Sequence, residues 1–262
     1  MATDAQIEYF VLLGATSVAA KPGSFKATPE IQEEALMSGQ QLTPQAYVTT
    51  QHLPQLGATL YDVDLVTTAT PFGSTLTPAS FHLGWRQRAQ NGLDSTYIRA
   101  SLAQGMLVPV SLNADANKPA ELEVMAIGLF SGTTGHTLST TSAARATPVT
   151  YRLSTIVLGG TTLANPKSLR CNWKYAWDFP PTEVLPTSMW VKEQQPEGSF
   201  VTLDLAAVTV ARLQASSETL VATFVNHANA ADTISVDLGT VRIKATISGN
   251  EANFAFAELD VA

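Results

Sequence analysis

The histidines of this chain are the first residues to consider for catalysis or metal binding, and they are widely scattered. Their positions are His52, His82, His136 and His227. A helical metal site needs two ligands about four residues apart on one face, and no histidine has such a partner. His82 falls on the polar side of a predicted strand, where an exposed or interface histidine is more common than a catalytic one. We therefore predict no metal site and no catalytic role for the histidines.

Two acidic residues and the single cysteine are the other candidates for chemistry. Asp62 and Asp64 share one side of a predicted strand and could hold a cation, but calcium loops supply several more oxygen ligands at short spacing. A solvated strand edge is the preferred interpretation of this pair. Cys171 lies on the apolar side of a strand with no nearby base or cation to lower its pKa, so we expect a buried, unreactive thiol.

No sequence motif for phosphate binding or for a nucleophilic serine is present. Gly159-Gly160 is best explained as a turn. A group of aromatic residues could form a sugar-binding platform, and its members are Trp173, Tyr175, Trp177 and Trp190. Three of these alternate along one strand face, which favours core packing. The sequence thus predicts a protein that is not an enzyme, with no catalytic, cofactor-binding or metal-binding residue, no cofactor and no small-molecule substrate.

The stretch 167–179 has the most regular pattern in the chain. Its large apolar residues, from Leu169 to Phe179, occupy every second position, and the positions between them are polar except for Ala176. A period of two sustained over this length predicts one long strand with a buried face and excludes a helix. A similar spacing occurs earlier, since Pro78, Ser80 and Trp85 match the intervals of Pro166, Ser168 and Trp173. We interpret this match as internal duplication, although any chain of glycine-turn hairpins aligns loosely with itself.

The remaining elements are predicted to be strands, with short helices only near the N-terminus. Thr28-Pro29-Glu30 resembles a helix start, with Gly39 as its stop, and a second helical turn is expected after Thr50, limited by Pro54. Pro109 predicts an edge strand or a bulge, and Asn91-Gly92 predicts a hairpin. Further strands are expected at 7–13, 65–70, 78–88, 97–103, 106–112, 121–130, 150–158, 201–205, 218–225 and 253–259, with a hairpin over 233–247 around Gly239.

These patterns together predict a mainly all-β fold. We expect two similar β-sandwich or barrel units that arose by internal duplication, with one or two short helices near the N-terminus. The predicted organisation is an N-terminal arm and short helix at 1–50, a first unit at 51–145 and a second unit at 146–262. The Gly-, Thr- and Ser-rich stretch 131–147 separates the two units.

The composition restricts the classes of function. Charged residues make up 14% of the chain, against a typical ~25%, so the surface is rich in Thr, Ser and Ala, as in proteins that contact other subunits. The net charge of −7 argues against a protein that grips nucleic acid, while passage of DNA without binding is compatible with it. We expect no transmembrane helix, because no apolar run approaches ~18 residues. The apolar stretch 7–15 lacks a basic segment before it, so no signal peptide is expected.

The order of several short motifs resembles the tail-tube and tube-related virion proteins of tailed bacteriophages. The motifs are Val48-Thr49-Thr50, Pro166-Lys167-Ser168 and Pro186-Thr187, within a region of about residues 45–225. This resemblance implies a virion structural protein with no catalytic residues, assembled in the host cytoplasm. Its expected partners are copies of itself and other virion proteins, in a ring around a DNA passage. A duplicated jelly-roll capsid protein and a carbohydrate- or receptor-binding β module are the alternatives.

Overall fold

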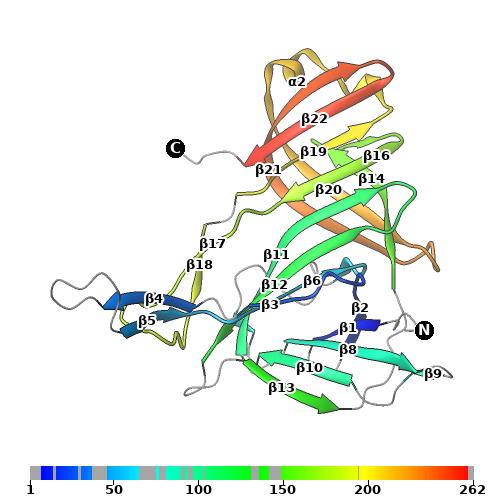
Figure 1. The fold of residues 1–262 in the computed structure, drawn as a ribbon. Helices are drawn as coiled ribbons and strands as arrows, with labels where there is room; N and C mark the ends of the chain where they lie inside the picture. The colour runs from blue at the N-terminus through cyan, green and yellow to red at the C-terminus, as the bar shows by residue number, and fades with distance from the viewer. Residues whose placement is uncertain are drawn as a thin grey trace.

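A computed structural model describes residues 7–13, 16–28, 31–36, 46–64, 75–76, 81–89, 92–93, 97–102, 104–130, 136–141, 149–193 and 195–258. These residues are mostly β-strand, which confirms the all-β class (Figure 1). The strands are β1 (Ile7–Leu13), β2 (Thr16–Ala19), β3 (Lys26–Thr28), β4 (Ile31–Leu36), β5 (Ala46–His52), β6 (Gln55–Leu60), β7 (Thr75–Leu76), β8 (Phe81–Ala89), β9 (Gly92–Leu93), β10 (Tyr97–Leu102), β11 (Gln104–Asp115), β12 (Glu121–Leu129), β13 (His136–Thr141), β14 (Tyr151–Leu158), β15 (Thr161–Leu163), β16 (Pro166–Asn172), β17 (Ala176–Asp178), β18 (Trp190–Glu193), β19 (Glu197–Thr202), β20 (Ser216–Asn226), β21 (Thr233–Ser248) and β22 (Glu251–Glu258). A 3-10 turn, η1 (Leu205–Ala207), precedes the helix α2 (Val210–Gln214).

One large antiparallel sheet forms the body of the molecule. Its strand order is β15-β14-β20-β21-β22-β19-β16-β11-β12-β6-β3, and β7 also pairs with β11. Buried residues alternate with partly buried or exposed ones along β6, β14 and β21, so each strand turns its apolar side chains to one face. The sheet folds over so that β14 packs against β16 and β11, and the core fills the space between the layers. Phe200 and Phe254 stack at its centre with ring centroids 4.6 Å apart.

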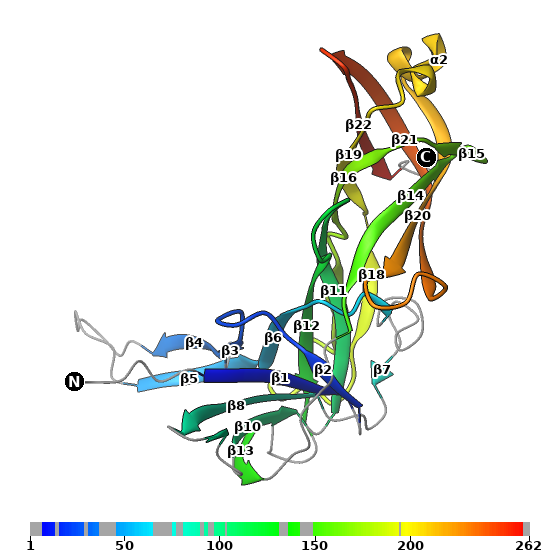
Figure 2. The same cartoon turned by 90° about the vertical axis from the view of Figure 1, so that its right-hand side faces the viewer.

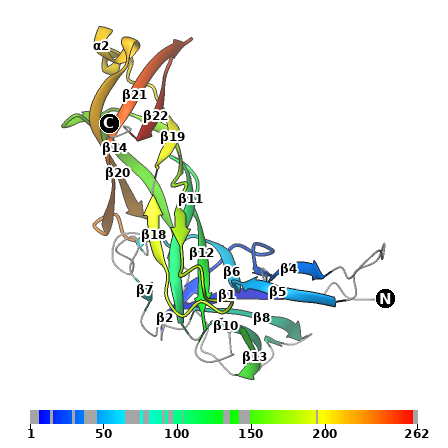
Figure 3. The ribbon, with the colours of Figure 1, turned by 90° about the vertical axis from the view of Figure 1, so that its left-hand side faces the viewer.

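A smaller sheet and two hairpins surround one end of this body. The smaller sheet has the order β13-β10-β8-β1-β2, with β9 paired to β8. The β17–β18 hairpin lies over β11 and β12, where Met106, Val108 and Met189 belong to a second apolar cluster. The β4–β5 hairpin projects sideways (Figures 2 and 3), while α2 and the turn between β21 and β22 lie at the opposite end.

The predicted N-terminal helices are wrong. The residues that resemble a helix after Thr28 form β4, which pairs with β5 from Leu36↔Ala46 to Ile31↔His52. The second predicted helical turn falls across the end of β5 and the start of β6, with Pro54 in the connection. Pairing with a segment more than ten residues away supplies more backbone hydrogen bonds than an isolated short helix, so the local capping signals were misleading. Gly39, Pro29 and Glu30 lie outside the described residues.

Two long elements also differ from the prediction. The strand expected over 167–179 is interrupted, because Lys174 has a φ of 44° and its N–H donates to Asn172 Oδ1 at 3.1 Å. The hairpin expected over 233–247 is the single strand β21. Gly239, with a φ of 75°, lies where the β20 register shifts between Thr219 and Val221, so it marks a bulge and not a turn.

The predicted duplication is not supported by the topology. Trp85 lies in β8 of the smaller sheet, between β1 and β10, whereas Trp173 follows β16 of the large sheet. The predicted equivalence of the two tryptophans is therefore wrong. The unit boundary at residues 145 and 146 stays a prediction, although β11 and β16 from its two sides pair directly.

Several local predictions are confirmed. The strand at 7–13 has the predicted bounds, and the predicted strands at 97–103, 121–130, 150–158 and 218–225 correspond to β10, β12, β14 and β20. Pro109 lies at a register shift between β11 and β12, which is the expected bulge. The predicted hairpin is present as the β8–β9 pair, but Gly92 pairs with Ala89 and so belongs to a strand and not to the turn. Asn91 and the predicted strand 65–70 lie outside the described residues. Gly159 and Gly160 have φ values of 56° and 78°, as a turn requires.

Candidate functional site

The outward face of the large sheet carries a polar groove over β11 and β16. Cross-strand pairing places Asn113 beside both Arg170 and Glu121. Two adjoining shallow pockets of about 460 and 370 Å³ share Asn113 and Arg170. The polar residues that line them are Tyr61, Ser111, Asn113, Asp115, Lys118, Glu121, Arg170, Asn172 and Glu197.

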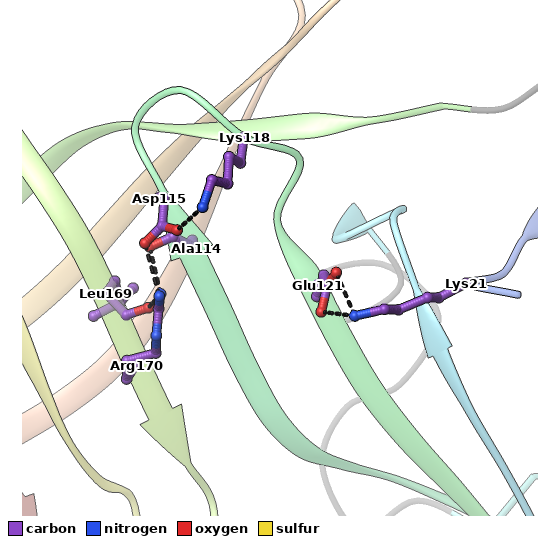
Figure 4. Close-up of polar contacts among 7 residues, drawn as sticks. All are labelled: Lys21, Ala114, Asp115, Lys118, Glu121, Leu169 and Arg170. Atoms are coloured by element: carbon purple, nitrogen blue, oxygen red, sulfur yellow. Dashed lines mark hydrogen bonds and ion pairs between the residues drawn. The ribbon is translucent and has the colours of Figure 1, made fainter. Parts of the chain in front are cut away.

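Three charged side chains of the polar groove, Arg170, Asp115 and Lys118, are paired with one another, as Figure 4 shows. Arg170 Nη2 donates to Asp115 Oδ1 at 2.7 Å, and its Nη1 donates to the carbonyls of Ala114 and Leu169 at 2.9 and 3.0 Å. Lys118 Nζ lies 3.5 Å from Asp115 Oδ2. Burial raises the pKa of Asp115, but Arg170 and Lys118 together outweigh that effect, so this pKa lies below its usual value. Arg170 and Lys118, the two cations that line the groove, are therefore both paired with Asp115. Neither is left free to bind an anionic ligand.

A second ion pair ties the first part of the chain to the same face. Lys21 Nζ donates to both carboxylate oxygens of Glu121, at 2.8 and 2.7 Å (Figure 4). The hydrogen bond from Lys21 raises the pKa of that ammonium group above its usual value. Both side chains remain substantially exposed, so this pair positions the segment after β2 and contributes little to stability.

The structure does not bring the four histidines together. His52 ends β5 and lies against Phe130, with ring centroids 5.0 Å apart. His82 and His136 belong to β8 and β13, and His227 is exposed after β20. Within the part of the chain that the structure describes, no group of three or more His, Cys, Asp or Glu residues is arranged to hold a metal ion.

The predictions for Cys171 and Trp173 are confirmed. Cys171 is 2% exposed, and burial raises the pKa of its thiol to about 12, so the thiol is protonated at neutral pH. Trp173 is 1% exposed and belongs to the main core. Trp177 is partly buried against the second cluster, whereas Trp190 on β18 is 47% exposed. The four aromatic residues therefore do not share one exposed platform.

Asp62 and Asp64 lie near a third carboxylate that the sequence did not indicate. Asp64 N–H donates to Asp62 Oδ1 at 3.1 Å, in the turn after β6. Asp232, from the turn before β21, accepts from Tyr151 Oη at 3.3 Å and from Asn226 Nδ2 at 2.8 Å. Burial, and then the charges of Asp64 and Asp232, raise the pKa of Asp62. Asp232 is far from Asp62 in the sequence and approaches this turn only in the folded chain, so the sequence spacing did not indicate that the two carboxylates are close.

Replacing Asp62 by asparagine is expected to stabilise the protein at pH 7 by up to about 1 kcal/mol. The raised pKa means that the folded state binds this proton more tightly than the unfolded state, so wild type loses stability as the pH rises through the interval between the two pKa values. Asparagine keeps the oxygen that accepts from Asp64 but carries no charge. Urea unfolding at pH 7 and pH 3 tests this, with no difference expected at pH 3. Asp237→Asn, at an exposed position of β21, is the control, and destabilisation of Asp62→Asn at pH 7 would contradict the prediction.

The β4–β5 hairpin is the second candidate surface. Glu33 and Glu34 point to opposite faces of β4, and both are exposed, so both faces of this hairpin are open to solvent. Tyr47 on β5 is 63% exposed. The sequence predicted a helix over part of this segment, so it gave no indication of a projecting strand pair.

The opposite end of the molecule carries exposed apolar side chains around η1 and α2. They are Leu203 (50%), Leu205 (43%), Val210 (69%) and Leu213 (44%). Thr209 caps α2 by accepting from Arg212 N–H, and the buried Arg212 side chain donates to Glu218 Oε1 at 2.8 Å and to the Ala207 carbonyl at 2.7 Å. This ion pair fixes the position of α2 on the sheet. The apolar residues are therefore presented on an anchored element.

The chain matches no protein-family model, and a comparison with curated proteins gives no significant match. Among the described residues there is no helix with the length and hydropathy needed to cross a membrane.

Proposed function

We propose that this protein is a non-enzymatic structural subunit of a phage-type particle, a tail-tube or tube-like ring protein that self-assembles around a DNA passage. The observation that supports it most is the β4–β5 hairpin, which pairs with no other described strand and has both faces in solvent. A two-stranded hairpin is at best marginally stable alone in water. Contact with a neighbouring subunit would stabilise it. The strands β1, β2 and β3 are paired within the two sheets, so the hairpin is the part of the predicted N-terminal arm that would lock neighbours together.

The surface composition supports the same proposal. Exposed apolar residues lie on the projecting hairpin and at the α2 end, at opposite ends of the molecule (Figures 2 and 3). Charged residues are only 14% of the chain, which lowers the desolvation cost of large interfaces. The net charge of −7 would repel phosphate if the excess acid lined a central bore, so DNA would pass without sticking.

Light scattering and negative-stain microscopy of the purified protein test the proposal. We expect rings or stacked tubes with a central opening, formed in a concentration-dependent manner. A variant in which residues 31–52 are replaced by a Gly/Ser linker is expected to stay monomeric while keeping the circular dichroism of a β protein. A wild-type protein that remains monomeric at high concentration would contradict the proposal, and closed shells would favour a jelly-roll capsid protein.

The exposed Trp190 favours one alternative function, a carbohydrate- or receptor-binding module. Its indole is 47% exposed on β18, and indole rings stack on sugar faces. A glycan array with wild type and Trp190→Ala distinguishes the two proposals. Binding that depends on Trp190, together with a monomeric protein, would favour the binding module.

A further inference from the structure

A pocket of about 290 Å³ lies between the end of α2 and the strands β21 and β22. We call it the tip pocket, and it is lined by Gln214, Ala215, Arg242, Lys244, Ala255, Phe256 and Ala257. Every one of these residues is neutral or basic. The register pairs Arg242 with Ala257 and Lys244 with Ala255, so each exposed cation stands beside a small apolar side chain. The pocket therefore combines a flat alanine floor with two positive charges along one side.

The surroundings of the tip pocket extend its apolar surface. Val210 and Leu213, on the helix that contributes Gln214, are 69% and 44% exposed. Exposed apolar side chains gathered in one patch mark protein contact sites, whereas single scattered ones do not. A matching partner would bring an apolar or aromatic side chain for the floor and a carboxylate for the cations.

One face of the β4–β5 hairpin has these two groups. The register pairs Ala35 with Tyr47 and Glu33 with Thr49, and directly opposed residues point to the same face. Tyr47, Ala35 and Glu33 therefore lie on one face of the hairpin, and Glu34 lies on the other. Tyr47 is 63% exposed, and Glu33 is also exposed.

We propose that this hairpin face docks into the tip pocket of a second copy, with Tyr47 on the alanine floor and Glu33 beside Arg242 and Lys244. The β4–β5 hairpin and α2, whose last residue lines the pocket, lie at opposite ends of the molecule (Figures 2 and 3), so a chain does not fill its own pocket. The contact is heterologous, and repeated copies form a closed ring or an open helical filament. This inference rests on the proposed self-assembly and names the two surfaces that carry it.

Charge reversal on the two surfaces tests the docking. We expect Glu33→Lys and Lys244→Glu each to lower the association constant between subunits at least tenfold, as measured by analytical ultracentrifugation. The double variant should recover most of the wild-type association constant. Glu34→Lys is the matched control on the opposite hairpin face, and Lys192→Glu is the control for an exposed lysine on β18. Both controls should assemble like wild type.

Chemical cross-linking gives a second readout, because it reports which two surfaces meet. A chain carrying Ala35→Cys, on the same hairpin face as Tyr47, and Ala255→Cys should form a ladder of covalent oligomers with a short bismaleimide, while Glu34→Cys with Ala255→Cys should not. Cys171 is buried with a raised pKa, so the native thiol does not react. A wild type that never assembles would overturn both proposals. If Glu33→Lys and Glu34→Lys weaken assembly equally, and no ladder of cross-linked oligomers forms, the docking proposal is overturned while the proposed self-assembly stands.

Discussion

Replacing Trp173 by alanine is expected to lower the free energy of unfolding by about 3–5 kcal/mol. The indole is 1% exposed and packs in the main core, among the side chains that join β11, β16 and β19. Its backbone N–H donates to the Val110 carbonyl at 3.1 Å and its carbonyl accepts from Gln195 at 3.1 Å, so the site cannot collapse readily to fill the cavity. Guanidinium unfolding followed by circular dichroism measures the change.

Trp190→Ala is the matched control for this experiment. The same side chain is removed from β18, where 47% of it is exposed, and a change within about 0.5 kcal/mol is expected. A loss of less than about 1 kcal/mol in Trp173→Ala would mean that this indole is not packed as described.

Replacing Arg212 by alanine is expected to cost about 3 kcal/mol at pH 7. The side chains of Arg212 and Glu218 are only 10% and 16% exposed, so the variant leaves a carboxylate in a poorly solvated site. The hydrogen bond from Arg212 lowers the pKa of Glu218. The stability from this pair is therefore present above the unfolded pKa of about 4.3, and it is lost as the pH falls through the lower folded value. Unfolding measured at pH 7 and below pH 3 should show the difference between wild type and variant shrinking.

Two further variants separate the charge pair from other effects. Arg152→Ala removes an exposed arginine from β14 and should change the stability by less than about 0.5 kcal/mol. Arg212→Met combined with Glu218→Met should recover part of the loss, because no buried charge is left unpaired. A double variant less stable than Arg212→Ala at pH 7 would contradict this explanation.

Alternating apolar residues predicted most strands because that pattern depends only on which face of the strand is buried. The pattern identified β14, β20 and the first part of the long element that contains Trp173. The pattern failed at Lys174 and Gly239, which both have a positive φ. The strand is interrupted at Lys174, and the register with β20 shifts at Gly239. Local cap signals failed at β4, because pairing with β5 is a contact between distant residues.

The candidate surfaces were not predictable from the sequence for the same reason. Glu33 meets Tyr47 on one hairpin face only through the β4–β5 register. Arg242 and Lys244 meet two alanines only through the β21–β22 register. The placement of Asp232 near Asp62 likewise requires the folded chain. By contrast, the buried thiol of Cys171 was predictable, since its position within an alternating strand decided its environment.

The long strands β11 and β21 run along the length of the molecule between the hairpin end and the α2 end (Figures 2 and 3). Ladder hydrogen bonds lie perpendicular to their strands. Tension between the two ends therefore shears many of these bonds at once and does not open them one after another. A filament built through contacts at those ends would place its mechanical load in the direction in which each subunit resists extension best.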